Sequence, residues 1–508
     1  MSGQRKPAQP VSLPWLLDGI SPTDLSFAGA AQVADLTLDS RDVRPGTLFF
    51  ALAGRRRHGL EFAAEAALRG ARTILWEPAA DVSWPVLPAG VFAAPIPGLP
   101  GLLGRIADRF FGWPSQDLRV CGFTGTNGKT TCAYLLAQCL ERLGSSSAYI
   151  GTLGLGRVGA LASPSHTTPD VFRVHRTLAE LRADGVRDVA IEVSSHALDQ
   201  GRVDGVRFHT AAFTNLTRDH LDYHETMEAY GAAKARLFTR PDLARIVLNV
   251  GDEFGRRLAA RAGADVPVTA VWVGTPAFAW AAERYLQVTS VTPDVRGLSL
   301  CLRGSDGPLA LHSSLIGRFN AENLVVVLAC LLGLGVPADR AVAALGACTA
   351  APGRMQLVAA AQAGRPLAVI DYAHTPDALA KTLQALREHC RGLLWCVFGC
   401  GGDRDPGKRP IMGAIAAELA DRIIVTDDNP RSEDPAAITA AILAGIAEPK
   451  VRVIHDRGAA IAAALTEAAA EDWVLIAGKG HEDYQIYGQT RKSFSDSREA
   501  ERLLGVAA

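Results

Sequence analysis

Short apolar runs recur along the chain, each followed by a polar loop and then by residues with helical apolar spacing. The alternation is clearest near the C-terminus, in the runs LAVI (367–370), LLWCVF (393–398), RIIV (422–425), KVRVI (450–454) and WVLIA (473–477). Strands that alternate with helices predict βαβ units and parallel sheets. Because ligands bind outside the carboxyl ends of such strands, we expect the loops after these runs to meet at one edge of a sheet.

The alternation falls into three blocks, and a chain of 508 residues is long enough for about three domains. The first block covers residues 1–98 and ends in a proline-rich stretch, the second covers 99–350, and the third covers 351–508. We therefore predict an α/β protein of three domains. The longest apolar run, residues 324–336, is too short to span a bilayer and predicts a buried helix.

Composition narrows the classes of function. Apolar residues make up 48% of the chain and charged residues 21%, which is typical of a globular protein, and a net charge of −1 favours neither nucleic acid nor a membrane surface. The N-terminal segment lacks the apolar core of a signal peptide. The nine cysteines lie mostly in apolar runs, where we expect reduced thiols. We expect a cytoplasmic protein without nucleic-acid or membrane partners, and a monomer.

The strongest single motif is the glycine-rich stretch GFTGTNGKTT, which follows the strand-like run LRVCGF and precedes a helical pattern. In such a loop the backbone N–H groups surround phosphate oxygens, the lysine reaches the terminal phosphates, and the next hydroxyl ligates Mg²⁺. Phe123 replaces the first glycine of the usual pattern, but a chance glycine turn is the weaker interpretation in this strand–loop–helix context. The predicted ATP-binding residues here are Gly125, Thr126, Asn127, Gly128, Lys129, Thr130 and Thr131.

Two later stretches carry candidate metal ligands. Glu192 ends the apolar run DVAIE, where a carboxylate is well placed to hold Mg²⁺, although a capping glutamate is the alternative. The segment FTNLTRDHLDYHETMEAYGAAKARLF then brings His220, Asp222, His224 and Lys234 close together in sequence, as a site or as a hydrogen-bonded turn. Lys234 lies among alanines in a helical pattern, so these residues alone predict an exposed helical lysine.

The loop TDDNPRSEDP, residues 426–435, crowds acids, an amide, a proline and an arginine directly after the run RIIV. These charges could neutralise one another in water, or they could bind a molecule that carries both an amine and a carboxylate. Its position after a predicted parallel strand favours the second interpretation.

Motifs from nearly the whole chain resemble the Mur ligases, which are ATP-dependent amide ligases of bacterial cell-wall synthesis. They are LTLDSRDVRPGTLFFALAG, GTNGKTT, EVSSH, TNLTRDHLDYH, AAK, IGRFNAEN, APGRMQ, DYAHTPDAL, GCGGDRDPGKRP, DDNPR and GKGHEDYQI. The resemblance implies an N-terminal uridine-nucleotide α/β domain, a central P-loop parallel-sheet ATPase domain and a C-terminal Rossmann-like α/β domain that binds the amino acid.

The resemblance also implies roles for individual residues. Lys129, Glu192, His220 and Lys234 match catalytic positions, and Mg²⁺ is expected on Thr130, Glu192, His220 and Lys234, the last as a carbamate formed with CO₂. Further ATP contacts are expected from Asn323, Arg354, Asp371 and His374. The UDP-substrate contacts are expected from Leu38, Ser40, Arg55, Arg56, Arg57, Thr167, Thr168, Ser194, Gln200 and Arg202.

The motifs are most similar to those of the family members that add the third residue to UDP-N-acetylmuramoyl-L-alanyl-D-glutamate. That residue is meso-2,6-diaminopimelate or L-lysine, and the two differ by one carboxylate, which an arginine could bind. The arginine of DDNPR matches the diaminopimelate form, and L-lysine remains the alternative. The expected contacts are Arg404, Asp428, Asn429, Pro430, Arg431, Gly478 and Glu482.

Two other interpretations remain open from the sequence. Folylpolyglutamate-type ligases share the P-loop domain but lack the N-terminal LDSR domain and the DNPR loop. A non-catalytic nucleotide-binding module is the alternative from another class. The complete set of Lys129, Thr130, Glu192, His220 and Lys234 favours an enzyme.

Overall fold

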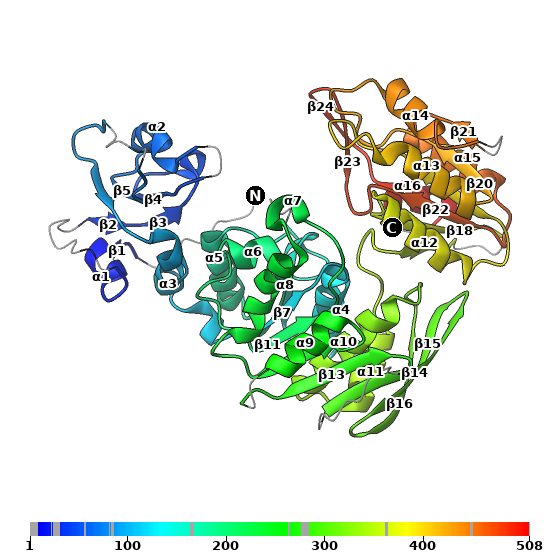
Figure 1. Ribbon diagram of the computed structural model, residues 1–508, viewed down its shortest axis with the longest axis horizontal. Helices are drawn as coiled ribbons and strands as arrows, with labels where there is room; N and C mark the ends of the chain where they lie inside the picture. The colour runs from blue at the N-terminus through cyan, green and yellow to red at the C-terminus, as the bar shows by residue number, and fades with distance from the viewer. Residues whose placement is uncertain are drawn as a thin grey trace.

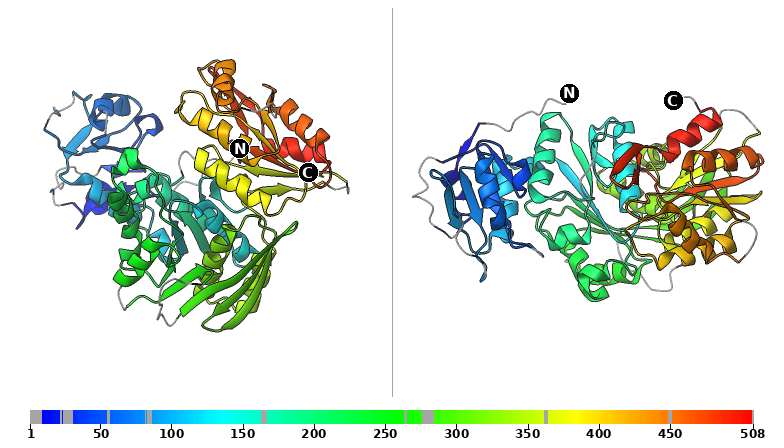
Figure 2. Two further views of the ribbon diagram at one scale, coloured as in Figure 1. Left: turned by 45° about the vertical axis from the view of Figure 1, so that its right-hand side comes forward. Right: turned by 90° about the horizontal axis from the view of Figure 1, so that it is seen from above.

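Three larger β-sheets, of four, ten and six strands, follow one another along the chain, together with two two-stranded sheets. The structure is a computed structural model that describes residues 9–21, 23, 31–54, 57–80, 82, 86–162, 167–262, 265–275, 284–360, 364–447 and 451–506. Each large sheet is covered by helices, and the N- and C-terminal lobes flank the central one (Figures 1 and 2). The predicted α/β architecture is confirmed.

The N-terminal sheet has four parallel strands in the order β3-β4-β5-β6. Phe50 packs with α1 and α3 on one face, and its neighbour Phe49 packs with α2 on the other, because successive side chains of a strand point to opposite faces. The elements are β1 Val11–Ser12, α1 Leu13–Leu17, β2 Gln32–Val33, β3 Asp35–Thr37, η2 Ser40–Asp42, β4 Thr47–Ala51, η3 Gly59–Phe62, α2 Ala63–Leu68, β5 Thr73–Trp76, β6 Phe92–Pro95 and α3 Leu99–Phe110.

The central sheet is parallel across β14-β13-β12-β11-β7-β10-β8 and antiparallel at both ends. Helices α4, α10 and α11 cover one face, and α5 and α9 cover the other. The strands are β7 Arg119–Thr124, β8 Ser147–Gly151, β9 Gly154–Gly156, β10 Asp188–Glu192, β11 Thr210–Phe213, β12 Arg245–Asn249, β13 Val268–Val273, β14 Arg284–Asp294, β15 Gly297–Gly304 and β16 Gly307–Ser313.

Several helices of this lobe begin at side-chain caps, and α4 begins at a loop glycine. Asp170 caps α5 by accepting from two backbone N–H groups, and Gly128 precedes α4 in a left-handed conformation. The helices are η4 Pro114–Gln116, α4 Lys129–Arg142, α5 Val171–Ala183, α6 Ser195–Asp199, α7 Leu221–His224, α8 Met227–Ala235, η5 Arg236–Thr239, α9 Glu253–Arg261, α10 Asn320–Gly333 and α11 Ala338–Gly346. The buried helix predicted from residues 324–336 is α10.

The C-terminal sheet has the order β17-β18-β22-β19-β20-β21 and is parallel except for β17. Helices α12 to α14 cover one face, and α15 and α16 cover the other. The strands of the sheet are β17 Gln356–Val358, β18 Leu367–Asp371, β19 Leu394–Phe398, β20 Arg422–Val425, β21 Val451–Val453 and β22 Trp473–Ala477, and β23 Tyr484–Tyr487 and β24 Thr490–Ser493 form a separate two-stranded sheet. The helices are α12 Pro376–Arg387, α13 Lys408–Leu419, α14 Pro435–Leu443, α15 Arg457–Glu467 and α16 Asp496–Leu504.

Two further expectations concern cysteines and membranes. All nine cysteines are free, and all except Cys301 are buried, as expected for reduced core thiols. Among the described helices, none is long and apolar enough to cross a membrane.

Candidate active site

The glycine-rich loop lies between β7 and α4, as predicted, and two of its glycines are required by close contacts. Gly125 has a φ of +154°, and a Cβ there would lie 1.9 Å from Thr214 Oγ1. Gly128 has a φ of +86°, and a Cβ there would lie 2.3 Å from Asn323 Oδ1. No other residue type fits these positions without displacing the neighbours. The same contact places the predicted ATP-binding Asn323 against the loop.

Two lysines point into this loop. Lys129 Nζ donates to the carbonyl oxygens of Gly125 and Thr126, each at 2.8 Å, and Lys234 Nζ donates to Gly125 O at 2.8 Å. Lys234 is 1% exposed, so the prediction of an exposed helical lysine from the residues alone is wrong. The physical reason is the inward face of α8, where Tyr230 lies four residues earlier and holds its ring 4.3 Å from Lys234 Nζ.

Burial lowers the pKa values of these two lysines and of His220. Burial lowers the pKa of Lys234 well below its ordinary value, the Lys129 ammonium lowers it further, and Asp219 opposes the shift. Burial also lowers the pKa of Lys129, against the pull of Glu192 and Asp219. The pKa of His220 is lowered by burial, while Asp219 raises it and both lysines lower it. Lys234 therefore has an amine that loses its proton readily, and His220 is predominantly neutral at neutral pH.

Glu192 is held at the end of β10, where it is 1% exposed. Its Oε2 accepts from Thr130 Oγ1 at 2.9 Å, and its Oε1 accepts from Thr152 N at 2.9 Å and from the hydroxyl of Tyr149. Burial and the Glu192 charge raise the pKa of Tyr149, so this phenol stays protonated and donates. The capping alternative for Glu192 is wrong, because the cap of α6 is Ser194.

The donor atoms of the predicted metal ligands suit a hard divalent cation. Thr130 offers a hydroxyl, Glu192 a buried carboxylate in direct contact with it, and His220 a neutral imidazole. Lys234 contributes oxygen only after it has become a carbamate. Among the residues that the structure describes, no three His, Cys, Asp or Glu side chains gather as a metal site.

The histidine segment forms an aromatic cluster around His196. The ring of His196 lies 4.9 Å from that of His220 and 5.4 Å from that of His224. His224 is buried and makes a 2.9 Å hydrogen bond to Ser195 Oγ, whereas Asp222 is exposed. His224 therefore has a structural partner, and His220 is a histidine whose pKa both lysines lower.

Five predicted substrate contacts meet beside Glu192. Thr168 Oγ1 donates to Glu192 O at 2.8 Å and accepts from Ser194 N at 3.2 Å. Arg202 donates to Thr168 O at 2.9 Å and to Gln200 Oε1 at 2.6 Å. Thr167 joins them through Thr152, whose hydroxyl donates to Thr167 Oγ1 at 3.2 Å. Residues from three separate segments thus form one polar surface at the carboxyl end of β10.

The N-terminal contacts follow two adjacent parallel strands. Leu38 and Ser40 come after β3, and Arg57 comes after β4, so they lie at the same edge of the sheet. Ser40 is buried and donates to Glu65 Oε2 at 3.0 Å, whereas Arg57 is exposed. Arg55 and Arg56 lie outside the described residues.

Arg354, Asp371 and His374 lie where the chain enters the C-terminal lobe. The guanidinium of Arg354 lies 4.6 Å from the centre of the Tyr372 ring and is close enough to lower the pKa of Lys129 in the glycine-rich loop. Asp371 accepts from Met355 N at 2.8 Å and from Ala373 N at 2.9 Å, so its carboxylate orders the backbone next to Arg354. His374 is exposed after β18.

The loops after β18, β19, β20 and β22 meet at one edge of the C-terminal sheet, as predicted from the sequence. Gly478 N donates to Asp371 O at 3.1 Å, and Gly402 N donates to Asn429 O at 2.9 Å. A Cβ on Gly402 would lie 1.9 Å from Pro430 O, and one on Gly478 would lie 2.7 Å from Asp428 Oδ2. The seven residues expected to bind the amino acid therefore belong to one continuous cluster, Arg404, Asp428, Asn429, Pro430, Arg431, Gly478 and Glu482.

Several charged groups of this cluster retain free hydrogen-bonding positions. Within the described chain, Arg404 has no hydrogen bond or ion pair, and Arg431 uses its guanidinium for one bond only, from Nη1 to Gly402 O at 2.6 Å. A Cβ on Gly401 would lie 2.8 Å from Arg431 Nη1 and 3.6 Å from Arg404 Cγ, so the two arginines are neighbours. In the same part of the chain the carboxylate of Asp428, 8% exposed, has no hydrogen-bond partner.

Sequence reasoning missed several residues of these sites. Asp219 acts on both lysines, Tyr149 and Thr152 hold Glu192, and Asn215 Oδ1 accepts from Asn127 N at 2.9 Å. Lys479 was also missed, although it directly follows the apolar run WVLIA-Gly, a position like that of Glu192 after DVAIE.

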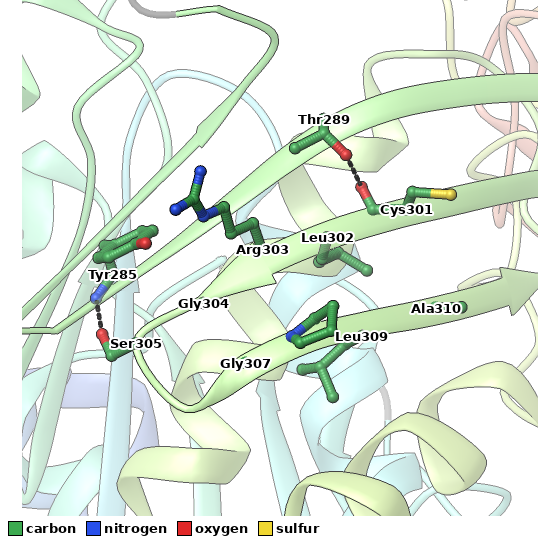
Figure 3. A pocket seen from close by; sticks show the side chains of 11 residues that line it. Tyr285, Thr289, Cys301, Leu302, Arg303, Gly304, Ser305, Gly307, Leu309 and Ala310 are labelled. Carbon is green, nitrogen blue, oxygen red and sulfur yellow. Dashed lines mark hydrogen bonds between the residues drawn. The ribbon is translucent and has the colours of Figure 1, made fainter.

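An open surface pocket of about 850 Å³ lies elsewhere, on the meander β14 to β16 (Figure 3). Its wall includes Tyr285, Thr289, Cys301 and Arg303, and Arg303 is the charged residue among the described ones that line it. None of the predicted site residues belongs to this wall.

Comparisons with known proteins agree with this arrangement. Three family models match the chain: the Mur ligase family catalytic domain over residues 32–111, the Mur ligase middle domain over 123–331, and the Mur ligase glutamate ligase domain over 353–480. The chain is 49% identical over 482 residues to UDP-N-acetylmuramoyl-L-alanyl-D-glutamate–2,6-diaminopimelate ligase of Xanthomonas campestris, covering 95% of this chain and 96% of the relative. It is 48% identical over 480 residues to the ligase of the same name from Pseudomonas aeruginosa, covering 93% and 95%.

Solved structures of similar fold include a ligase with the same name as these relatives. A structure of a UDP-N-acetylmuramoyl-L-alanyl-D-glutamate–2,6-diaminopimelate ligase matches with a TM-score of 0.69 at 34% identity, covering 98% of this chain and 99% of the other. The folylpolyglutamate synthase of Mycobacterium tuberculosis, complexed with ADP and AMPPCP, matches at 19% identity with a TM-score of 0.60, covering 80% and 96%, and shares the fold alone. The chain belongs to the Mur ligase family.

Proposed function

We propose that this chain is an ATP-dependent ligase that joins meso-2,6-diaminopimelate to the D-glutamate of UDP-N-acetylmuramoyl-L-alanyl-D-glutamate, in the cytoplasm, during the synthesis of cell-wall peptide. The names of relatives about 49% identical over nearly the full chain support it. The alternative is the same reaction with L-lysine. In this proposal the N-terminal, central and C-terminal domains cover residues 1–98, 99–350 and 351–508, and bind the UDP moiety, ATP and the amino acid.

The choice of diaminopimelate rests on charged groups in the loops after β19 and β20 that have unused hydrogen-bonding positions. Two neighbouring arginines, Arg404 and Arg431, have unused donors, and Asp428 has an unused carboxylate among the described residues. Diaminopimelate carries two carboxylates and two ammonium groups, which complement both signs. L-lysine lacks the distal carboxylate and would leave an arginine without an anionic partner.

The UDP-linked substrate would reach from the N-terminal sheet to the polar surface beside Glu192. Leu38, Ser40 and the arginines 55–57 are proposed to hold the uridine diphosphate end. Thr167, Thr168, Ser194, Gln200 and Arg202 are proposed to hold the muramoyl-dipeptide, because they are already joined to one another and to Glu192 by hydrogen bonds. This arrangement would bring the D-glutamate carboxylate toward the glycine-rich loop.

Amide formation in water needs an activated carboxylate. The D-glutamate side chain would attack the γ-phosphate of ATP and give an acyl phosphate and ADP, and the amine of the amino acid would then attack the acyl carbon. The tetrahedral intermediate would collapse to amide and phosphate. Lys129, now bonded to Gly125 and Thr126, is placed to neutralise charge on the transferring phosphoryl group. Arg354 and the loop from Asp371 to His374 would close over ATP and exclude water, which would hydrolyse the acyl phosphate.

Mg²⁺ is proposed on Thr130, Glu192, His220 and the Lys234 carbamate. When bound, it would offset negative charge on the phosphates. The low pKa of the Lys234 amine supports carbamate formation, because only the neutral amine adds CO₂. Asp219, Tyr149 and Thr152 are proposed to hold these groups in place.

Phosphate release separates a ligase from a nucleotide-binding module. We expect rapid phosphate release only when ATP, UDP-N-acetylmuramoyl-L-alanyl-D-glutamate and diaminopimelate are all present, with omission of any one lowering the rate by at least about 100-fold, since the final bond requires all three. The measurement is a coupled phosphate assay with each substrate left out in turn. Phosphate release that ignores the UDP-linked substrate would rule out the ligase.

Folate substrates serve as the control for the neighbouring family. We expect no product when a pteroylglutamate and L-glutamate replace the UDP-linked substrate and diaminopimelate. The N-terminal sheet, with Ser40 and Arg57 at one edge, supports this expectation.

A further inference from the structure

We propose that Lys479 is a positioning residue for the amino-acid site: it fixes Asn429 and one oxygen of Glu482, so that the other oxygen of Glu482 is free for an ammonium group of the incoming amino acid. This inference deepens the proposed function and rests on it. Lys479 lies in the loop after β22, whereas Asn429 lies in the loop after β20.

The three side chains form a closed triangle of hydrogen bonds. Lys479 Nζ donates to Glu482 Oε2 at 3.0 Å and to Asn429 Oδ1 at 3.3 Å. Asn429 Nδ2 completes the triangle by donating to the same Glu482 Oε2 at 2.9 Å. Lys479 is 0% exposed and Asn429 is 2% exposed, so water does not replace these contacts. Charge-assisted hydrogen bonds are strong in such surroundings.

The side-chain amide of Asn429 can take only one orientation in this triangle. Asn429 Oδ1 also accepts from Ile486 N at 3.0 Å, so two donors hold that end of the amide and its Nδ2 must face Glu482. An amide turned the other way would bring Nδ2 against the Lys479 ammonium and the Ile486 N–H group. The hairpin strand β23, which contains Ile486, therefore helps to set the triangle.

Glu482 is left with one oxygen for a ligand. Both protein donors, Lys479 and Asn429, go to Oε2, and within the described residues Oε1 has no hydrogen-bond partner. The Glu482 side chain is 17% exposed, so it is not sealed off from solvent. A carboxylate with one fixed and one free oxygen presents its free lone pairs in a defined direction, which suits an ammonium ligand.

A purely structural role for Lys479 makes a different prediction. If Lys479 only stabilised the turn in which Glu482 N donates to Lys479 O at 3.0 Å, its loss would lower the melting temperature and disturb all substrates alike. A positioning role changes the amino-acid step selectively.

The test uses the full-length enzyme with Lys479→Met. We expect the KM for diaminopimelate to rise by about 10- to 100-fold, the change typical of lost charge-assisted hydrogen bonds, with a smaller fall in kcat. We expect the KM values for ATP and for the UDP-linked substrate to stay within about twofold. Lys381→Met is the matched control, because Lys381 is exposed on α12 and pairs with Asp377, and it should leave all constants unchanged.

A second variant keeps the test decisive if Lys479→Met does not fold. Lys479→Gln retains a donor without the charge and should give the same selective rise in the KM for diaminopimelate. In a Glu482→Gln background, Lys479→Met should raise the KM for diaminopimelate by a smaller factor than it does in the wild type, because the two residues act through one contact. An unchanged KM for diaminopimelate, or an equal rise in all three KM values, would overturn the inference.

The two proposals fail in distinguishable ways. A wild-type enzyme that releases no phosphate with any amino acid overturns the proposed function and the role of Lys479 with it. An active wild type whose Lys479 variants bind the amino acid normally overturns only the role of Lys479.

Discussion

Lys234→Ala is expected to lower kcat by at least about 100-fold, the usual cost of removing one preorganised electrostatic group from an active site. Lys234 is buried and bonded to the glycine-rich loop at Gly125 O, and the variant removes the carbamate expected to help hold Mg²⁺. The measurement is kcat from phosphate release with all three substrates saturating. Lys381→Ala, in an exposed helical turn of α12, is the matched lysine control and should keep full activity.

The carbamate itself gives this prediction a pH and CO₂ dependence. Since the pKa of Lys234 is lowered by burial, its amine is neutral over a wider pH range and adds CO₂, whereas acidification protonates it and removes the carbamate. We expect activity to fall as the pH is lowered, to fall in CO₂-depleted buffer, and to return on adding bicarbonate. Labelling with ¹³CO₂ should give a carbamate signal that Lys234→Ala lacks. Full activity without CO₂, together with no such signal, would contradict the role.

Arg431→Ala is expected to raise the KM for diaminopimelate by about 100-fold or more, because the distal carboxylate would lose its charged partner in a partly buried site. The backbone of Arg431 is fixed in place: its φ is +53°, its N–H donates to Ile486 O at 3.0 Å, and its carbonyl accepts from Gly488 N at 2.6 Å. The affinity for the UDP-linked substrate should change little, since Arg431 lies in the amino-acid cluster.

Competition with lysine shows whether Arg431 sets the selectivity. Arg431→Ala should lower kcat/KM for L-lysine much less than it lowers kcat/KM for diaminopimelate. The ratio of the two kcat/KM values, which measures the preference for diaminopimelate, should therefore shrink. Arg452→Ala, an exposed arginine on β21 paired with Glu467, is the control and should behave as the wild type. An equal fall in kcat/KM for both amino acids would show that Arg431 does not set the specificity.

The charged loop after β20 shows what local sequence can and cannot predict. Its placement after a parallel strand follows from the run RIIV, and the structure confirms it. Mutual neutralisation within the loop is wrong, because Asp427 bonds to His455 Nδ1 at 2.8 Å and Tyr487 OH at 3.1 Å, and Arg431 forms no ion pair with the described residues. Those partners come from distant segments, which no local pattern reveals.

The sequence predicts which polar residues lie at the ends of strands, but it does not predict which side chains are buried. The positions of Glu192 and of the glycine-rich loop could be predicted because each lies at the end of a predicted strand. Lys234 could not, because its burial depends on which face of α8 turns inward, and its alanine neighbours suit either face. Lys479 shares the strand-terminal signal of Glu192, but its role depends on Asn429 from another loop.

The most direct measurement of the central claim compares kcat/KM of the wild-type enzyme for meso-diaminopimelate and for L-lysine, with ATP and the UDP-linked substrate saturating. We expect a preference for diaminopimelate of at least about 100-fold, because lysine leaves an arginine in the Arg404–Arg431 pair without its carboxylate. Equal constants, or a preference for lysine, would contradict the account.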